Sequence, residues 1–175
     1  MFTFSSVLFL HFSDDARLAI RKVSFCPTTG QLHIGGTAGQ VILFKLSDDA
    51  KEDADIPVIK SDLVTENEGF KWKGHQPLVV KADKFKMPQG FQPTSILTIS
   101  PPASVNSLAF SDDYGILAIG TAHGLIILDT IQSIVALTKC TLNAQGESVL
   151  PTFQAYQLFI FLLIFVHFFF RHCQC

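Results

Sequence analysis

Two stretches of the chain carry the same pattern of apolar runs and turns. Residues 22–44 read KVSFCPTTGQLHIGGTAGQVILF, and residues 107–129 read SLAFSDDYGILAIGTAHGLIILD. In each stretch, clusters of turn-forming residues such as Gly, Asp and Thr separate short apolar runs, which is typical of tight turns between strands. The runs are too short for helices, which need about ten or more periodic residues. Each stretch therefore predicts three strands joined by turns.

A fourth strand follows each of the two stretches. In the second repeat the predicted strands are Val105–Ser111, Ile116–Gly120, Leu125–Asp129 and Ser133–Thr138. In the first repeat they are Lys22–Cys26, Gln31–Gly35, Gln40–Leu46 and, after an insertion, Thr94–Ser100. The insertion at 47–93 is interrupted by Pro residues and is expected to be irregular. Without it, the repeat has the spacing of about 40–45 residues found in propeller blades.

Sheets with such short strands and two apolar faces cannot bury themselves alone. Each sheet must lie between two similar sheets, and radial repetition in a ring of at least ~4 blades achieves this. We therefore expect an all-β fold, with about two four-stranded antiparallel blades of an incomplete β-propeller. The fold also includes a long irregular insertion at 47–93 and an apolar C-terminal tail at 144–175 that could be helical.

The repeats and the apolar ends divide the chain into four predicted segments. Residues 1–12 form an apolar N-terminal segment that is unrelated to the two repeats. Residues 13–104 form the first blade with its insertion at 47–93. Residues 105–143 form the second blade, and residues 144–175 form an apolar tail.

The tail contains a candidate membrane segment at 149–170. Its continuous apolar run, Leu158–Phe170, has 13 residues, whereas a spanning helix needs about 20. Extending the run back to Val149 takes in Pro151 and two Gln residues, and buried polar groups are costly in a bilayer. Two readings stay open: a small protein with a C-terminal membrane anchor, or a non-functional truncated product with unrelated sequence at both ends.

Composition and charge narrow the function. The net charge is -2, from 13 Lys and Arg against 15 Asp and Glu, and no basic cluster suited to phosphate backbones occurs, so we expect no nucleic-acid partner. Neither a P-loop nor a His-Glu-x-x-His motif is present. The Gly-rich stretch 35–39 joins two predicted strands instead of opening a helix. The sequence predicts no enzyme, no catalytic residue, no cofactor and no metal site.

Single residues carry the remaining expectations. Cys26 and Cys140 lie in predicted strands and are expected to be buried free thiols, as in a reducing cytosol. His33 lies in an alternating strand and is expected to be a core or edge histidine with satisfied hydrogen bonds. Trp72 either anchors a partner, since Trp is favoured at binding hot spots, or packs the insertion back on the blade.

The second repeat resembles the WD40 pattern, in which a strand ends in Phe-Ser and the unit closes on Trp-Asp. The residues that keep the pattern are Phe110, Ser111, Gly115, Gly124 and Asp129. Leu128 stands where the pattern has Trp, so the hydrogen bond usually made by that Trp is absent. The structural turn positions are expected at Gly36, Gly115, Gly124 and Asp129.

A larger part of the chain, residues 13–141, resembles the lethal giant larvae family, to which the tomosyns are distantly related. The matching stretches are SDDARLAI at 13–20, GTAGQV at 36–41, KWKGH at 71–75, GFQP at 90–93, PP at 101–102, GTAHG at 120–124 and KCTL at 139–142. KWKGH and GFQP, in that order, favour lethal giant larvae over tomosyn. Trp72, His75 and Phe91 in these two motifs are the candidate partner-binding residues.

This resemblance implies a non-enzymatic scaffold for cell polarity, the cortical cytoskeleton and regulated exocytosis. The implied partners are proteins: syntaxin-type SNAREs, myosin II, and atypical protein kinase C with its polarity complex. The implied location is the cytoplasm, with association to the cell cortex or plasma membrane, or anchoring through residues 149–170. The family's kinase-regulated loop, rich in Arg and Ser, has no counterpart after Asn143. Regulation of membrane binding by phosphorylation is therefore not carried over.

Overall fold

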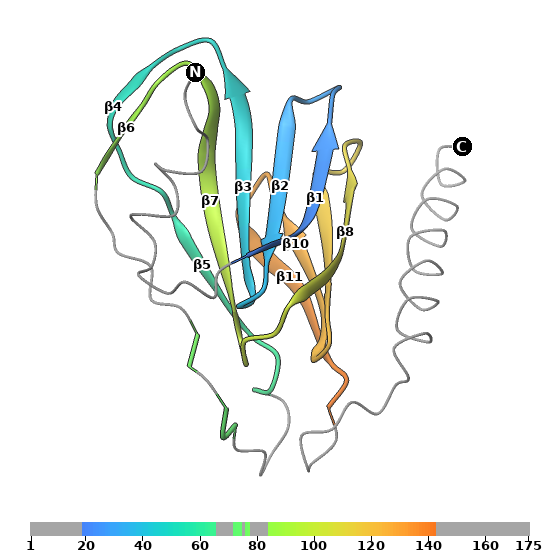
Figure 1. The fold of residues 1–175 in the computed structure, drawn as a ribbon. Helices are drawn as coiled ribbons and strands as arrows, with labels where there is room; N and C mark the ends of the chain where they lie inside the picture. The colour runs from blue at the N-terminus through green and yellow to red at the C-terminus, as the bar shows by residue number, and fades with distance from the viewer. Residues whose placement is uncertain (1–18, 66–71, 75, 78–83, 143–175) are drawn as a thin grey trace, which may run out of the picture.

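All regular secondary structure in the described part of the chain is β. The computed structural model describes residues 19–65, 72–74, 76–77 and 84–142, without the side chain of Phe85. These residues form the strands β1 to β11, arranged in three sheets (Figure 1). The all-β prediction is confirmed. The predicted segments 1–12 and 144–175, with the candidate membrane segment 149–170, lie outside the described residues, as does His75.

The second repeat forms a four-stranded antiparallel sheet, as predicted. Its strands are β8 (Val105–Ser111), β9 (Ile116–Thr121), β10 (Gly124–Asp129) and β11 (Ile134–Cys140). Each strand pairs with its sequence neighbour, in the order β11-β10-β9-β8. All bounds agree with the prediction within two residues, because tight turns limit each short apolar run at both ends.

The first repeat forms a five-stranded sheet, not the four-stranded one predicted. Its strands are β1 (Ile20–Cys26), β2 (Gln31–Gly36), β3 (Gln40–Ser47), β7 (Gly90–Ser100) and β5 (Val58–Asp62). The order is β1-β2-β3-β7-β5, and β5 pairs with β7 in parallel. The fifth strand comes from the insertion, because the outer edge of β7 offers unpaired backbone groups that the segment 58–62 satisfies. The expectation of a wholly irregular insertion was therefore wrong.

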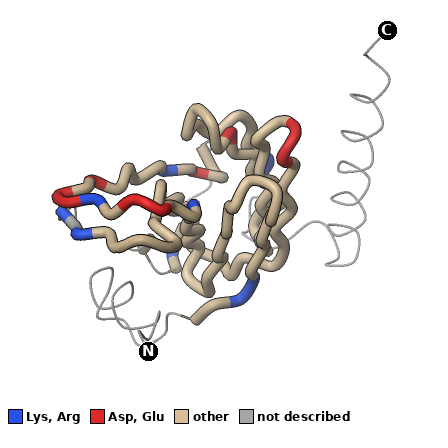
Figure 2. The backbone as a smooth tube through the Cα atoms, turned by 90° about the horizontal axis from the view of Figure 1, so that it is seen from above, with Lys and Arg blue, Asp and Glu red and all other residues tan. Residues whose placement is uncertain are grey.

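The insertion also contributes a separate two-stranded ribbon, which joins β4 (Lys51–Ala54) to β6 (Phe85–Met87). Charged residues gather on this projecting ribbon (Figure 2). Across it, Lys86 Nζ lies 2.7 Å from Glu52 Oε2. Both side chains are exposed, so this ion pair contributes less than about 1 kcal/mol.

The two large sheets pack face to face, and the main core lies between them (Figure 1). At one side of the stack β1 contacts β8, and at the other β5 contacts β11. The core side chains are apolar and come from both sheets and the insertion: Val41, Leu43, Leu63, Leu97, Ile99, Val105, Leu117, Ile119, Ile126 and Leu128. Burial of each stabilises the fold by about 1.5–3 kcal/mol, so the stack is the main source of stability in the described residues.

A smaller cluster lies on the outer face of the first sheet. Ile42, Phe44 and Ile96 are buried there, and Ile56 from the insertion packs against them. Toward β1 this face becomes exposed, since Phe25 keeps 53% of its surface accessible. The sheet is thus apolar on both faces, as the repeat pattern predicted.

No helix among the described residues is long and apolar enough to cross a membrane.

Candidate interaction site

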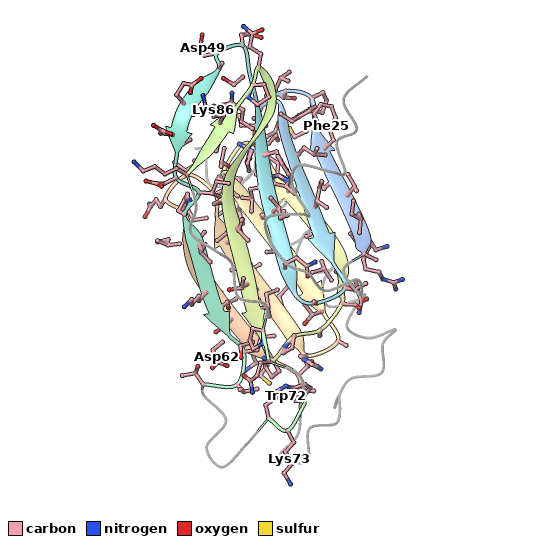
Figure 3. All side chains as sticks on the ribbon, turned by 60° about the vertical axis from the view of Figure 1, so that its left-hand side comes forward. Phe25, Asp49, Asp62, Trp72, Lys73 and Lys86 are labelled. Carbon is pink, nitrogen blue, oxygen red and sulfur yellow. The ribbon has the colours of Figure 1, made fainter. Side chains whose placement is uncertain are left out.

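The insertion returns to the second sheet through Trp72. Its ring lies edge-on to the ring of His123, with the ring centroids 5.1 Å apart and an interplanar angle of 61°. His123 belongs to the β9–β10 turn, and its Nδ1 lies 3.3 Å from the Pro101 carbonyl oxygen. Figure 3 shows Trp72 at one end of the stacked sheets, with Lys73 pointing away from them. We call Trp72, His123 and Pro101 the Trp72 contact.

The turn that carries His123 is fixed by its own hydrogen bonds. The amides of His123 and Gly124 each donate to Thr121 Oγ1 at 3.2 Å. The His123 carbonyl accepts from the Thr141 amide at 2.9 Å. A Cβ at Gly124 would collide with the Lys139 carbonyl, so only glycine allows β10 to approach β11 this closely. These bonds fix the backbone of the turn that presents the imidazole to Trp72.

The insertion is anchored at the same end of the stack by Leu63. Its side chain is buried in the main core, and its amide donates to the Ser100 carbonyl at 2.8 Å. On the other side of Trp72, a Cβ at Gly74 would collide with the indole. This contact gives a packing reason for the glycine in KWKGH.

Trp72 packs the insertion against the second sheet, which is one of the two roles left open by the sequence. The indole is half-buried and Lys73 is exposed. The surface around Trp72 is therefore accessible to a partner. The role of Trp72 in partner binding stays a prediction.

Docking of Trp72 on His123 can be tested by fluorescence, because the chain has one Trp. We expect His123→Ala to shift the Trp72 emission to longer wavelength, since the indole loses its ring partner and gains water. Asp113→Ala, in the exposed β8–β9 turn, is the control and should leave the emission unchanged. An unshifted spectrum for His123→Ala would contradict the contact.

Phe91 lies elsewhere. Its ring makes an edge-to-face contact with Phe25, with centroids 5.9 Å apart at 83°, on the outer face of the first sheet. Figure 3 places Phe25 at the end of the molecule opposite Trp72. Along β7, Phe91 and Pro101 are about 30 Å apart at ~3.3 Å per residue. Trp72 and Phe91 therefore do not form one site.

Gln92, next to Phe91, is a structural residue that the sequence analysis missed. It is buried, and its side-chain amide donates to the carbonyls of Asp49 at 2.6 Å and Pro88 at 3.0 Å. These bonds join the segment after β3 to the β6–β7 connection. The available signal was a polar residue inside the GFQP motif, but its partner Asp49 lies 43 residues away in the sequence and could not be identified from it.

His33 is the second residue whose role the sequence did not reveal. It is fully buried on the inner face of the first sheet, and its ring centroid lies 4.6 Å from that of Phe110 in the second sheet. Nε2 lies 3.2 Å from Gln31 Oε1, while Nδ1 has no hydrogen-bond partner among the described residues. The prediction that the hydrogen bonds of His33 are satisfied therefore holds for Nε2 and not for Nδ1. Desolvation lowers the pKa of His33 from 6.5 to about 4.

The two cysteines in the strands form no disulfide among the described residues, and they are half-buried instead of buried. Cys26 Sγ lies 3.8 Å from Asp112 Oδ2. Hydrogen bonding from Thr29 lowers the Cys26 pKa below its usual value. Within residues 19–142, where described, no group of three or more His, Cys, Asp or Glu side chains could hold a metal ion.

The four residues expected at structural turns lie at strand ends. Asp129 Oδ1 accepts from the amides of Ile131 at 2.9 Å and Gln132 at 2.8 Å, which closes the β10–β11 turn. Gly115 has φ +63, a conformation that side chains disfavour, and its carbonyl accepts from Thr130. Gly36 ends β2, beside the Gln40 side chain, and Gly124 begins β10.

These features define a class of protein: in the described residues, an all-β fold of two stacked sheets built from repeated meanders, with strand β5 and Trp72 of the insertion packed against the stack. No protein-family model matches the chain. Curated relatives do match. The Lethal(2) giant larvae protein of Drosophila pseudoobscura pseudoobscura is 38% identical over 142 residues, which cover 78% of this chain and 12% of that protein. The human LLGL scribble cell polarity complex component 2 is 38% identical over 139 residues, covering 79% of this chain and 14% of that protein.

A third relative, the human Lethal(2) giant larvae protein homolog 1, is 39% identical over 132 residues, covering 75% of this chain and 12% of that protein. The chain is therefore a partial homologue of lethal giant larvae proteins, and the resemblance read from its motifs is confirmed. It spans 12–14% of the length of these relatives.

Proposed function

We propose that this chain is a non-catalytic interaction module of the lethal giant larvae type, and that its two large sheets are consecutive blades of a WD40-like propeller. The observation that carries the proposal is the stack itself. The first strands of the two repeats, β1 and β8, are neighbours, and the outer strands β5 and β11 are neighbours as well. In a propeller, neighbouring blades are related by a rotation about the central axis, and the first strand of each blade lies nearest that axis. Two such blades contact each other at their first strands and again at their outer strands, as these two sheets do.

The apolar outer faces support the same proposal. Phe25 on the first sheet and Leu137 on the second keep 53% and 48% of their surfaces exposed. In a ring of at least ~4 blades, the next blade on each side would cover such faces. The two sheets would then contribute one sector of that ring.

The proposed role is in cell polarity, the cortical cytoskeleton and regulated exocytosis. The human relative is named as a component of the scribble cell polarity complex. By family resemblance, the partners are syntaxin-type SNAREs, myosin II and the atypical protein kinase C polarity complex, reached from the cytoplasm at the cell cortex. We place the contact surface on the insertion around Trp72, because it combines a half-buried aromatic ring with the exposed Lys73.

A pull-down on immobilised syntaxin and on immobilised myosin II tests this function. A full-length relative is the positive control. We expect this chain to be retained by at least one of the two, and Trp72→Ala to reduce retention at least fivefold. Lys86→Ala, on the β4–β6 ribbon away from Trp72, is the matched surface control (Figure 3). Retention of the relative without retention of this chain on either partner would contradict the proposal.

A further inference from the structure

The strand β5 forms one edge of the first sheet, at the side opposite β1 (Figure 1). Two printed bonds show how it pairs with β7. The Ile96 amide donates to the Pro57 carbonyl at 3.0 Å, and the Leu63 amide donates to the Ser100 carbonyl at 2.8 Å. In a parallel pair, alternate residues of a strand bond to the same neighbour. The odd-numbered residues 57–63 therefore bond to β7.

The even-numbered residues of β5 turn their backbone groups away from β7. The amides and carbonyls of Val58, Lys60 and Asp62 therefore point out of the sheet in its own plane, and no described strand lies beside them. Such a row of backbone groups is a template for pairing with another strand. A neighbouring blade covers the faces of a sheet and not its outer edge, so this edge stays open in the proposed ring as well.

Ser61, in the middle of the edge, has a buried hydroxyl group that is not satisfied. The residue keeps 4% of its surface exposed, and its Oγ has no hydrogen-bond partner among the described residues. Buried side-chain polar atoms normally have a partner. On either side of Ser61, the exposed Lys60 and Asp62 carry opposite charges. The edge therefore combines a hydroxyl that lacks a partner with one charge of each sign.

We propose that β5 pairs with β5 of a second copy of this chain, antiparallel, with the two Ser61 residues directly opposite each other. In this register Lys60 lies opposite Asp62 of the second copy, and Asp62 lies opposite Lys60 of the second copy. Cross-strand pairs of opposite charge and of two hydroxyl residues both stabilise antiparallel strands. Each Ser61 Oγ gains a hydrogen-bond partner, and the two five-stranded sheets become one continuous sheet.

The charges and the backbone select this register. Lys60 and Asp62 both have outward-facing backbone groups, so each Lys60–Asp62 pair exchanges two hydrogen bonds. A pairing centred on Lys60 or on Asp62 would place two like charges directly opposite, which destabilises the pair. A pairing centred on Ile59 would place Lys60 opposite Val58. A strand from another protein would need an acidic and a basic residue two positions apart, which a second copy of β5 supplies.

Sedimentation of the full chain over a range of concentrations tests the proposal. We expect a reversible equilibrium between monomer and dimer. Lys60→Glu places a glutamate opposite Asp62 twice in the dimer and should weaken it at least tenfold. Lys22→Glu is the matched control, because Lys22 is an exposed lysine on β1, the other edge strand of the same sheet. This control should leave the dissociation constant unchanged.

Mixing two charge variants makes the test specific to the register. Asp62→Lys places a lysine opposite Lys60 and should also weaken the dimer at least tenfold. In an equal mixture of Lys60→Glu and Asp62→Lys, both cross-strand pairs have opposite charges again, so the heterodimer should form. The Trp72 emission shows that each variant remains folded. A chain that stays monomeric at about 100 µM, a dimer that Lys60→Glu leaves unchanged, or a mixture that stays monomeric would each overturn the proposal.

A cysteine at the centre of the edge tests the same pairing by geometry. Directly opposite residues of a non-hydrogen-bonded pair have Cα atoms about 4.5 Å apart, which allows a disulfide. Under oxidising conditions, Ser61→Cys should give a dimer whose peptide map contains a link from position 61 to position 61. Thr98→Cys is the control, because Thr98 is buried on β7, one strand inside the edge, and should give no such link. Absence of the 61–61 link would overturn the proposal.

Discussion

Lowering the pH from neutrality to about 4 will reduce the free energy of unfolding by up to about 3 kcal/mol through His33 alone. Burial between the sheets lowers the pKa of His33 from 6.5 to about 4. Between these two values the unfolded chain binds a proton that the folded chain excludes, so stability falls as the pH falls. Above pH 6.5 both states are neutral at His33 and its contribution is constant.

The measurement is urea denaturation at a series of pH values, followed by the emission of Trp72. His33→Leu is the matched variant, because leucine is similar in volume and does not titrate. We expect the difference in stability between neutral pH and pH 4 to be smaller in His33→Leu by about 2–3 kcal/mol. Parallel pH curves for the two proteins would show that His33 is not buried in the core.

Gly35→Ala will destabilise the chain by about 1–3 kcal/mol, although alanine is tolerated in most strands. A Cβ at position 35 would lie 2.6 Å from Val105 Cγ1 and 2.8 Å from Val105 Cβ. Gly35 belongs to the first sheet and Val105 to the second, so the added methyl group pushes the two sheets apart. Both residues are buried, so the Val105 side chain cannot turn into solvent to make room for the methyl group.

A double-mutant cycle makes this prediction specific. Val105→Ala alone leaves a cavity and should also destabilise the chain. In the double variant the methyl group at 35 partly fills that space, so the two costs should fall short of additivity by about 0.5–3 kcal/mol. Strictly additive effects would mean that the two side chains do not meet across the stack.

The sequence predicted the strands best where the pattern is local. In the second repeat, alternation and tight turns gave every strand to within two residues, because each pairs with its neighbour in the chain. In β7 the prediction began four residues late, at Thr94 instead of Gly90. Pro93 suggested a strand start, since proline cannot donate to a ladder. In the structure Pro93 faces Phe44 beside a register shift, which accommodates it within the strand.

Non-local pairings could not be read from the sequence. The segment 58–62 pairs in parallel with β7, which is distant from it in the sequence, and nothing in its own residues specifies that partner. The β4 segment reads KEDA and lacks the alternation typical of a strand. For the candidate site, the sequence identified Trp72 but not His123 as its partner, because that contact depends on how the two repeats stack.

The central claim is that the two repeats form stacked sheets sharing one core. Methyl-methyl nuclear Overhauser effects in a sample labelled at Ile, Leu and Val test it most directly. The claim predicts cross-peaks linking Val41, Leu43 and Leu97 of the first sheet to side chains of the second, including Leu117, Ile119 and Leu128. Cross-peaks confined to residues within each sheet, with none between the two sets, would contradict it.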